Sequence, residues 1–172
     1  MPGAPRFRIV LAKEDFKFSA AHFTIFGPGR AELFHGHNYH VAVELTGTGL
    51  DEVGLLADID AAKRAIRAAC ARLDNRTLIP AASREIGWSE EGEAVEVRFD
   101  RRVYRFPAVD VLRLPLANTS MELLARMLWQ EIAPQLAGMR VQELAVSVEE
   151  SAGQRCVYEA PLAGSPPASS AL

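Results

Sequence analysis

The chain has few of the residues that mark secreted or membrane proteins. It contains two cysteines in 172 residues, Cys70 and Cys156, which are too few for a disulfide framework and lack the spacing of a zinc knuckle. No apolar run reaches the roughly 20 residues of a membrane span, and the opening MPGAPRFR lacks the apolar stretch of a signal peptide. The sequence therefore predicts a cytoplasmic protein with reduced thiols and no membrane partner.

The chain also lacks an excess of basic residues. The chain has 19 Lys and Arg against 22 Asp and Glu, a net charge of −3, and no basic run or arginine-aromatic patch, so we expect no nucleic-acid partner. Hydrophobic residues make up 49% of the chain, which is enough for a real core. We expect a single domain over residues 6–160. The stretch 161–172, PLAGSPPASSAL, is rich in Pro, Ala and Ser, and it predicts a disordered tail.

Hydrophobic periodicity predicts an α+β fold. Alternating residues indicate strands, and apolar residues at helical spacing indicate two amphipathic helices. The predicted elements are strands over 7–22 and 35–46, helices over 58–73 and 118–136, an inserted hairpin over 93–107 that turns near Asp100, and a final hairpin that turns around 151–154. This order predicts an antiparallel four-stranded sheet with both helices on one face, plus the inserted hairpin.

All four histidines lie between residues 22 and 40. Side chains at i and i+2 of a strand share a face, so His35 and His37 point together, whereas His40 points to the other face. If the two strands pair across the loop 23–34, His22 reaches the same spot. Each histidine could be a hydrogen-bonded strand residue, but three convergent imidazoles with an open position favour a catalytic zinc site. His40 is interpreted as structural.

Four stretches together resemble one enzyme family. FSAAHF at 18–23, HGHNYHVAVELTG at 35–47, NTSMELLARMLW at 118–129, and VSVEES followed by VYE at 146–159 resemble the 6-pyruvoyl-tetrahydropterin synthase and 6-carboxy-tetrahydropterin synthase family. The resemblance runs from about Phe7 to Glu159. It implies the tunnelling fold (T-fold), assembly of the chain into homo-oligomers, either trimers or hexamers, with active sites between subunits, and a pterin substrate, usually 7,8-dihydroneopterin triphosphate. It also implies zinc (Zn2+) held by His22, His35 and His37.

The resemblance places the substrate-binding residues on three positions. Glu150 corresponds to the family's pterin anchor, and it ends a row of core residues, where a carboxylate needs a partner. It could accept two adjacent pterin N–H groups, or it could be a solvated acid before a turn. Glu122 matches a position near the pterin, but it could equally complete a capping box at the start of its helix with Thr119. Ser120, in the same turn, is a further candidate for pterin binding.

Two catalytic residues of the family are missing. Ala31 stands where the family has its cysteine, and Asn75 replaces the histidine of an Asp-His pair. Glu32 stands beside the cysteine position, and members of a third type of this family similarly use a glutamate there. We expect Glu32 to be the general base, although it could be a plain solvated loop acid. Asp74, where the family places an acid, is the next candidate.

Three functions remain open on the sequence. The first is a zinc-dependent pterin lyase that acts on the C6 side chain of 7,8-dihydroneopterin triphosphate, and it is the one we favour. The second is a glutamate-based, aldolase-like enzyme that releases 6-hydroxymethyl-dihydropterin, and the third is a pterin-binding homologue without catalysis. In the favoured function Glu150 holds the ring and Glu32 takes a proton from a side chain acidified by the metal.

Overall fold

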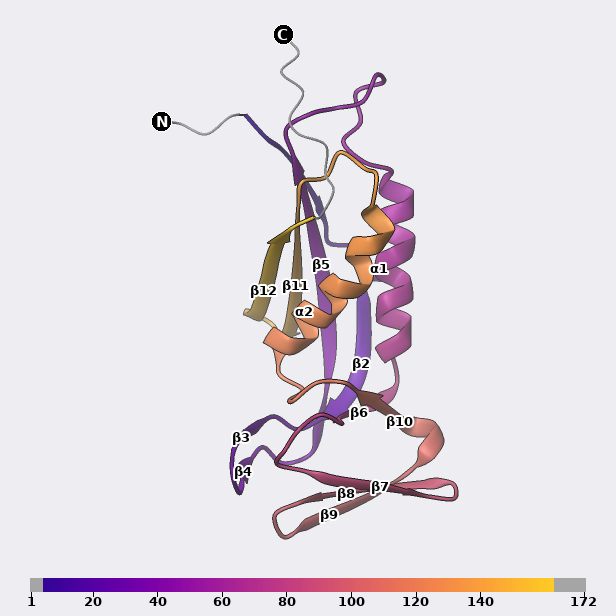
Figure 1. The fold of residues 1–172 in the computed structure, drawn as a ribbon, viewed down its shortest axis with the longest axis vertical. Coiled ribbons are helices and arrows are strands. Elements are labelled where there is room, and N and C mark those ends of the chain that lie inside the picture. The colour runs from indigo at the N-terminus through magenta and orange to yellow at the C-terminus, as the bar shows by residue number, and fades with distance from the viewer. Residues whose placement is uncertain (1–4, 163–172) are drawn as a thin grey trace.

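The described part of the protein consists of a twisted sheet with two helices packed on one face, and two smaller sheets at one end of the molecule (Figure 1). The computed structural model describes residues 5–162. The helices are α1 (Ile59–Leu73) and α2 (Met121–Ile132), with short 3-10 turns η1 (Ala108–Asp110) and η2 (Ala133–Leu136). The strands are β1 (Phe7–Leu11), β2 (Lys17–His22), β3 (Ile25–Gly27), β4 (Arg30–Ala31), β5 (His35–Gly47), β6 (Arg76–Pro80), β7 (Gly87–Glu91), β8 (Ala94–Phe99), β9 (Arg102–Pro107), β10 (Val111–Leu114), β11 (Glu143–Ser151) and β12 (Gln154–Pro161).

The main sheet has seven strands in the order β10-β6-β2-β5-β11-β12, and β1 pairs with the second half of β5. The predicted antiparallel pairs β2–β5 and β11–β12 are present, and β5 pairs with β11. The α+β class is confirmed, but three strands join the predicted four. Two of them, β6 and β10, run parallel to their neighbours. Strand β6 is almost continuously buried, so its sequence RTLIP lacks the alternation that marks a strand.

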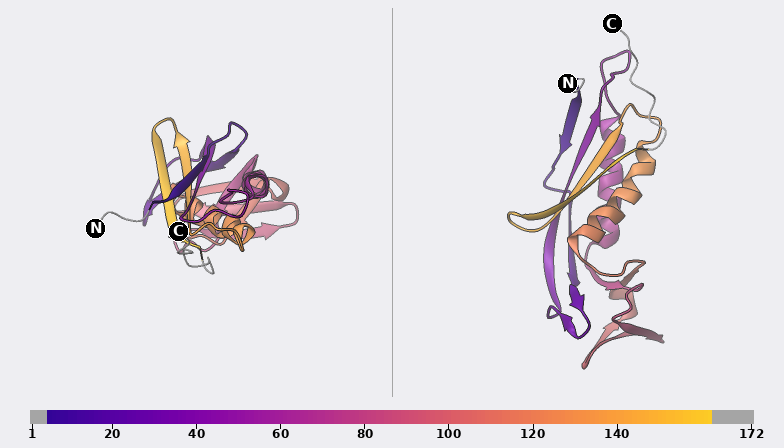
Figure 2. Two further views of the ribbon diagram at one scale, coloured as in Figure 1. Left: turned by 90° about the horizontal axis from the view of Figure 1, so that it is seen from above. Right: turned by 60° about the vertical axis from the view of Figure 1, so that its left-hand side comes forward.

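The core lies between the sheet and the two helices, which Figure 2 shows on the same side. Alternate residues of β5, from Tyr39 to Leu45, are buried beneath them. Helix α1 begins at Asp58, whose carboxylate accepts the backbone N–H groups of Asp60 and Ala61. Helix α2 is shorter than the predicted 118–136. It ends at Ile132, and a 3-10 turn containing Pro134 follows, because proline cannot continue the α-helical hydrogen bonds.

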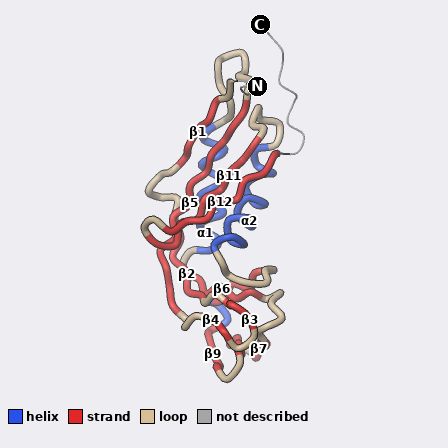
Figure 3. Tube along the Cα trace, turned by 90° about the vertical axis from the view of Figure 1, so that its left-hand side faces the viewer, coloured by secondary structure: helices blue, strands red, loops and turns tan. Residues whose placement is uncertain are grey.

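The inserted segment forms a three-stranded antiparallel meander, β7-β8-β9, rather than the predicted hairpin alone. The predicted turn is present between β8 and β9, where Asp100 has a φ of 52°. Figure 3 shows this meander at the same end of the molecule as β3 and β4. A second apolar cluster, separate from the main core, joins the meander to the loop 23–34.

Strand β12 is the last strand of the described residues. Strand β12 ends at Pro161, and the backbone N–H of Leu162 donates to the carbonyl of Gln142. The rest of the tail predicted over 161–172 lies outside the described residues. Among the described helices, none is both long and apolar enough to cross a membrane.

Candidate functional site

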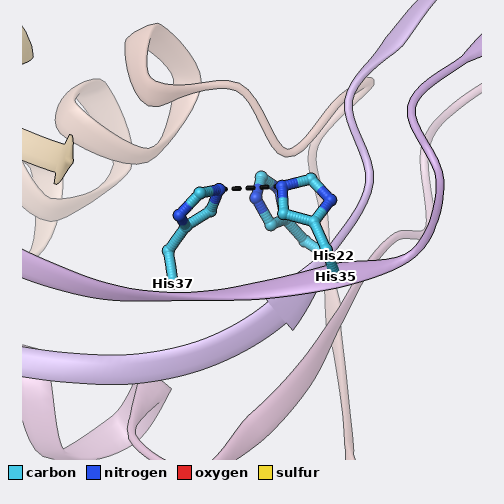
Figure 4. Close-up of side chains that lie close together, drawn as sticks. All are labelled: His22, His35 and His37. Carbon is cyan, nitrogen blue, oxygen red and sulfur yellow. Dashed lines mark hydrogen bonds between the residues drawn. The ribbon is translucent and has the colours of Figure 1, made fainter.

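Pairing of β2 with β5 brings three histidines together. In this register His22 lies opposite His35, and Ala20 lies opposite His37, so the three side chains share one face. Each offers a ring nitrogen, and the three atoms lie within 4.8 Å of one another (Figure 4). His22 is fully buried, and the other two are half-buried. The cluster therefore has the donor set of a site that could hold a metal.

Backbone carbonyls orient two of the imidazoles. Nδ1 of His22 lies 3.1 Å from the carbonyl oxygen of Thr119, and Nδ1 of His35 lies 2.7 Å from that of Leu33. A carbonyl can only accept, so each Nδ1 carries the hydrogen and donates it. The lone pair of each ring is then on Nε2, as in metal-binding histidines whose other nitrogen donates to a carbonyl.

His35 and His37 meet through their Nε2 atoms. Their Nε2 atoms lie only 2.7 Å apart, with the ring planes at 88° (Figure 4). With the His35 hydrogen on Nδ1, its Nε2 presents a lone pair to the other ring. The Nε2 of His37 donates to this lone pair when it carries the ring hydrogen, and both lone pairs can be directed at one metal ion when it does not. The residues present therefore fit a metal held by imidazole nitrogens.

Burial keeps His22 in the form that binds a metal. Desolvation lowers the pKa of His22 and outweighs the carboxylate of Glu150, which raises it. The imidazole is therefore neutral at neutral pH.

Glu150 lies against the histidines. Its Oε1 is 3.2 Å from Nε2 of His22 and 3.6 Å from Nε2 of His37. The hydroxyl of Tyr39 donates to the same Oε1 at 3.0 Å and lies 2.8 Å from Nε2 of His22. The other oxygen, Oε2, accepts from the side-chain amide of Gln154 at 3.2 Å. The carboxylate is thus partnered through both oxygens, and it is not a free strand-end acid.

Glu32 lies near His35. Its Oε2 is 4.0 Å from Nε2 of His35 and accepts the backbone N–H of Thr24 at 2.8 Å. Burial raises the pKa of Glu32, but the hydrogen bond from Thr24 and the nearby His35 outweigh it and lower the pKa overall. The side chain is therefore an ionised carboxylate at neutral pH, within reach of a group bound at the histidines.

The other predicted site residues lie apart from the cluster. Asp74 caps the end of α1, and its carboxylate accepts the backbone N–H of Ser19 at 2.7 Å and the amide of Asn75 at 2.9 Å. Within the described part of one chain, no hydrogen bond or ion pair links Asp74 to the three histidines. His40 is exposed on the opposite face of β5, and it takes no part in the cluster, as predicted.

The predicted capping box at the start of α2 is not formed. Ser120, not Thr119, is the N-cap, and its side chain makes no capping hydrogen bond. Glu122 is exposed in the first turn, and its charge contributes to a raised pKa of the Cys156 thiol, after burial. Thr119 instead donates its hydroxyl to the carbonyl of Phe23.

Sequence reasoning missed three residues that organise the site. Tyr39 shares the strand face of His35 and His37, which was the available signal, but it was not given a role. Thr119 is fully buried and supports His22 through its carbonyl. Asn118 accepts the backbone N–H of Ile25 and donates to its carbonyl, which fixes the start of the loop 23–34. These last two contacts join residues more than 90 positions apart, so no local pattern reveals them.

Comparisons with known proteins identify relatives of this arrangement. A family model described as 6-pyruvoyl tetrahydropterin synthase matches residues 11–161. A Methanocaldococcus jannaschii protein, provisionally named a 6-carboxy-5,6,7,8-tetrahydropterin synthase, is 28% identical over 145 residues, covering 83% of this chain and 88% of the relative. The solved 6-pyruvoyl tetrahydropterin synthase of Plasmodium vivax is 27% identical with a TM-score of 0.82, covering 91% of this chain and 99% of that chain.

Further solved structures extend the comparison. The Plasmodium falciparum 6-pyruvoyl tetrahydropterin synthase, 21% identical and covering 91% of this chain and 98% of that chain, has the same fold with a TM-score of 0.85. The Plasmodium vivax protein has also been solved with alanine or cysteine in place of a glutamate that is described as a catalytic residue. A glutamate therefore serves in catalysis in that protein.

Proposed function

Because this chain belongs to the 6-pyruvoyl tetrahydropterin synthase family of pterin-metabolising enzymes, we propose that it is a zinc-dependent lyase. The proposed substrate is 7,8-dihydroneopterin triphosphate, and the reaction takes place on its C6 side chain. The observation that carries the proposal is the convergence of His22, His35 and His37, two of them oriented by backbone carbonyls. Three neutral imidazoles with an open position are a common catalytic zinc arrangement.

His22, His35 and His37 would hold the zinc ion. When bound, zinc supplies a Lewis acid that lowers the pKa of hydroxyl groups on the substrate. The chain's own contribution is to fix the rings and to keep His22 neutral. Burial keeps His22 neutral, and the carbonyls of Thr119 and Leu33 fix the ring orientation of His22 and His35.

Glu150 would bind the pterin ring. A carboxylate can accept two parallel N–H groups from the cyclic amidine edge of a pterin, and such charged, bidentate hydrogen bonds fix orientation as well as affinity. Its partners in this structure, the Tyr39 hydroxyl and the Gln154 amide, are neutral donors that the ring can replace. Ser120 lies directly after Thr119 in the chain, and it stays a candidate for substrate contact. Glu122 is exposed and is a weaker candidate in a single chain.

Glu32 would be the general base. It is ionised at neutral pH, its carboxylate lies 4.0 Å from His35, and Thr24 holds it in place. Its lowered pKa makes it a weak base, so it can act only on a proton that the metal has made acidic. The catalytic glutamate of the Plasmodium vivax relative supports this role.

The glutamate also favours a second reaction. Ala31 replaces the family's cysteine, and Asn75 replaces its histidine, so the internal rearrangement lacks a second proton-transfer group. An aldolase-like cleavage that releases 6-hydroxymethyl-dihydropterin needs only one base, and Glu32 can serve as that base. If both catalytic losses are decisive, the protein binds pterin without converting it.

The proposed working form is a homo-oligomer, a trimer or a hexamer. In the described part of one chain, Asp74 makes no hydrogen bond or ion pair with the histidines, so we propose that any role it has in catalysis is at the site of a neighbouring copy. The cytoplasmic location stays a prediction from the sequence.

Product identification tests the proposed function. Zinc-loaded protein is incubated with 7,8-dihydroneopterin triphosphate and, separately, with 7,8-dihydroneopterin. A product with an altered C6 side chain from the triphosphate supports the lyase, and 6-hydroxymethyl-dihydropterin supports the aldolase-like reaction. If the protein binds both pterins but converts neither, the remaining function is that of a pterin-binding homologue without catalysis.

A further inference from the structure

The inserted meander β7-β8-β9 packs against the loop that carries Glu32. The cluster between them contains Phe23 and Phe34 from the loop and Phe99, Tyr104 and Phe106 from the meander. Ring centroids of Phe23 and Tyr104 lie 5.8 Å apart, and those of Phe34 and Phe106 lie 5.1 Å apart. Because Phe23 and Phe34 lie at the two ends of the loop, the meander supports both of its ends.

Arg102 adds polar contacts to the backbone at Ala31 and Glu32. It is the first residue of β9, and its guanidinium group donates to the carbonyl of Ala31 at 3.0 Å and to the carbonyl of Glu32. The same guanidinium lies over the Phe99 ring, 5.4 Å from its centroid. The planar donor fork of arginine can hold two acceptors in a fixed geometry. Two successive carbonyls are therefore fixed where the Glu32 side chain leaves the backbone.

Glu32 also makes two hydrogen bonds with Thr24, and its carboxylate lies 4.0 Å from Nε2 of His35. The backbone N–H of Glu32 donates to the carbonyl of Thr24, and its side chain accepts from the N–H of Thr24. Both bonds lie within the loop, so they cannot fix the loop relative to the histidines. Arg102 comes from a different sheet, which makes it an external support.

We infer that the meander acts as a brace for the catalytic loop and that Arg102 is a positioning residue, which acts through Glu32 without touching the substrate. The inference rests on the proposed role of Glu32 as the base. A misplacement of about 1 Å in a catalytic group can lower a rate about 100-fold. Loss of Arg102 should therefore slow turnover while it leaves the histidines and Glu150 unaffected.

Hydrogen exchange tests the brace without any need for activity. In Arg102→Ala, the backbone amides of residues 23–34 should exchange at least about 10-fold faster than in the wild-type protein, because local opening is no longer opposed by Arg102. Arg101→Ala is the matched control, since this neighbour is exposed and the hydrogen bonds to the carbonyls of Ala31 and Glu32 come from Arg102. Equal exchange in Arg102→Ala, Arg101→Ala and the wild-type protein would overturn the inference.

Kinetics test whether the brace acts through Glu32. We expect Arg102→Ala to lower kcat about 10- to 100-fold, with zinc content and pterin affinity within about twofold of wild type. Arg102→Lys should recover part of the rate, because lysine keeps one donor at the same place. In the Glu32→Gln background, Arg102→Ala should cost less than about twofold, since the group that it positions is no longer active.

The two possible failures are distinguishable. A wild-type rate in Arg102→Ala beside a slow Glu32→Gln variant overturns the positioning role alone. The same is true if Arg102→Ala lowers the rate equally in both backgrounds, because the loss then does not pass through Glu32. A full rate in Glu32→Gln overturns the proposed base itself.

Discussion

At the scale of single residues, the hydrogen bond made by Nδ1 of a histidine decides whether its Nε2 carries a lone pair that can bind a metal. Nδ1 of His22 and of His35 each donates to a carbonyl, so the lone pair of each ring that could bind a metal is on Nε2. Glu150 and Glu32 approach the cluster from different chain segments, and they differ in their partners. Glu150 is held by side chains, and Glu32 by a backbone N–H. This difference leads us to expect different effects when each is changed.

Replacing Glu150 with glutamine should weaken binding. The carboxylate is proposed to hold the pterin in the ground state and in the transition state alike, so the loss of a charged hydrogen bond should cost about 1.5–3 kcal/mol of binding free energy. That is an increase in Kd of about 10- to 100-fold. Calorimetric titration with a pterin measures it, and an unchanged Kd would remove Glu150 from the binding site.

Replacing Glu32 with glutamine should affect turnover instead. Glutamine cannot accept a proton in catalysis, so kcat should fall about 10²- to 10⁴-fold while pterin binding stays close to wild type. Steady-state rates on whichever pterin is converted measure the change. If the variant keeps full turnover, another group is the base, and Asp74 from a neighbouring copy becomes the candidate.

The lowered pKa of His22 predicts how stability depends on pH. An unfolded histidine takes up a proton below about pH 6.5, whereas the buried, neutral His22 of the folded metal-free protein does not. Protons then bind the unfolded state more strongly, so the free energy of unfolding should fall as the pH drops from about 7 to about 5. Thermal melts of the metal-free protein measure this slope. It should be shallower in His22→Asn and unchanged in His40→Asn, and equal slopes in all three proteins would contradict the prediction.

At the scale of elements, β5 connects the core to the site. Its first residues carry His35 and His37, its middle residues pack under the helices, and its last residue, Gly47, passes close to another segment. A Cβ atom at Gly47 would lie 2.4 Å from the carbonyl oxygen of Arg140, which is a backbone atom. A side chain here would therefore force the backbone at Arg140 to shift.

Gly47→Ala should destabilise the fold. Overpacking of this kind lowers the free energy of unfolding by about 1–3 kcal/mol, because a backbone segment must move. Gly49→Ala is the matched control, since a Cβ atom there meets nothing within 4 Å. Urea unfolding of both variants measures the difference. Equal midpoints would show that the contact at Gly47 relaxes without cost.

The elements with clear periodicity could be predicted from the sequence. Strands β2 and β5 and helices α1 and α2 each bury one face, so their apolar residues alternate or recur at helical spacing. Strand β6 is buried on nearly every residue, and β7 is fully exposed, so neither shows a pattern. The sequence predicts a single strand over 7–22, because apolar residues alternate in both β1 and β2. The structure has two separate strands there.

Part of the site could be predicted from strand alternation and from the family resemblance. His35 and His37 follow from strand alternation, and Glu32 and Glu150 were identified through family resemblance. Arg102 and Thr119 act on residues about 70 and 97 positions away in the chain. Their contacts depend on how the meander and α2 pack against the main sheet, which no local spacing encodes.

At the scale of the whole molecule, the open sheet indicates assembly. Strand β12 ends one side of the main sheet, and β1 and β10 have each a single partner in the described part of the chain. Phe7 and Val10 on β1 and Val157 on β12 are about half-exposed apolar side chains. Unpaired edges of this kind are normally covered, and pairing them between copies closes the sheet.

Sedimentation should therefore show a homo-oligomer, a trimer or a hexamer, at micromolar concentration. Edge pairing buries both the unpaired backbone groups and the exposed apolar side chains. A charged substitution on the edge, Val157→Lys, should shift the equilibrium toward smaller species, and Val103→Lys on the exposed face of β9 serves as its control. A stable 18.8 kDa monomer of the wild-type chain would contradict this assembly.

The central claim is that His22, His35 and His37 form the metal centre of the protein. Zinc content per chain, measured on purified protein after dialysis against zinc and then buffer, tests it most directly. We expect about one zinc per chain in the wild-type protein and in His40→Ala, whose histidine lies on the opposite strand face, and none in His35→Ala or His37→Ala. Stoichiometric zinc retained in both of these last two variants would contradict the claim.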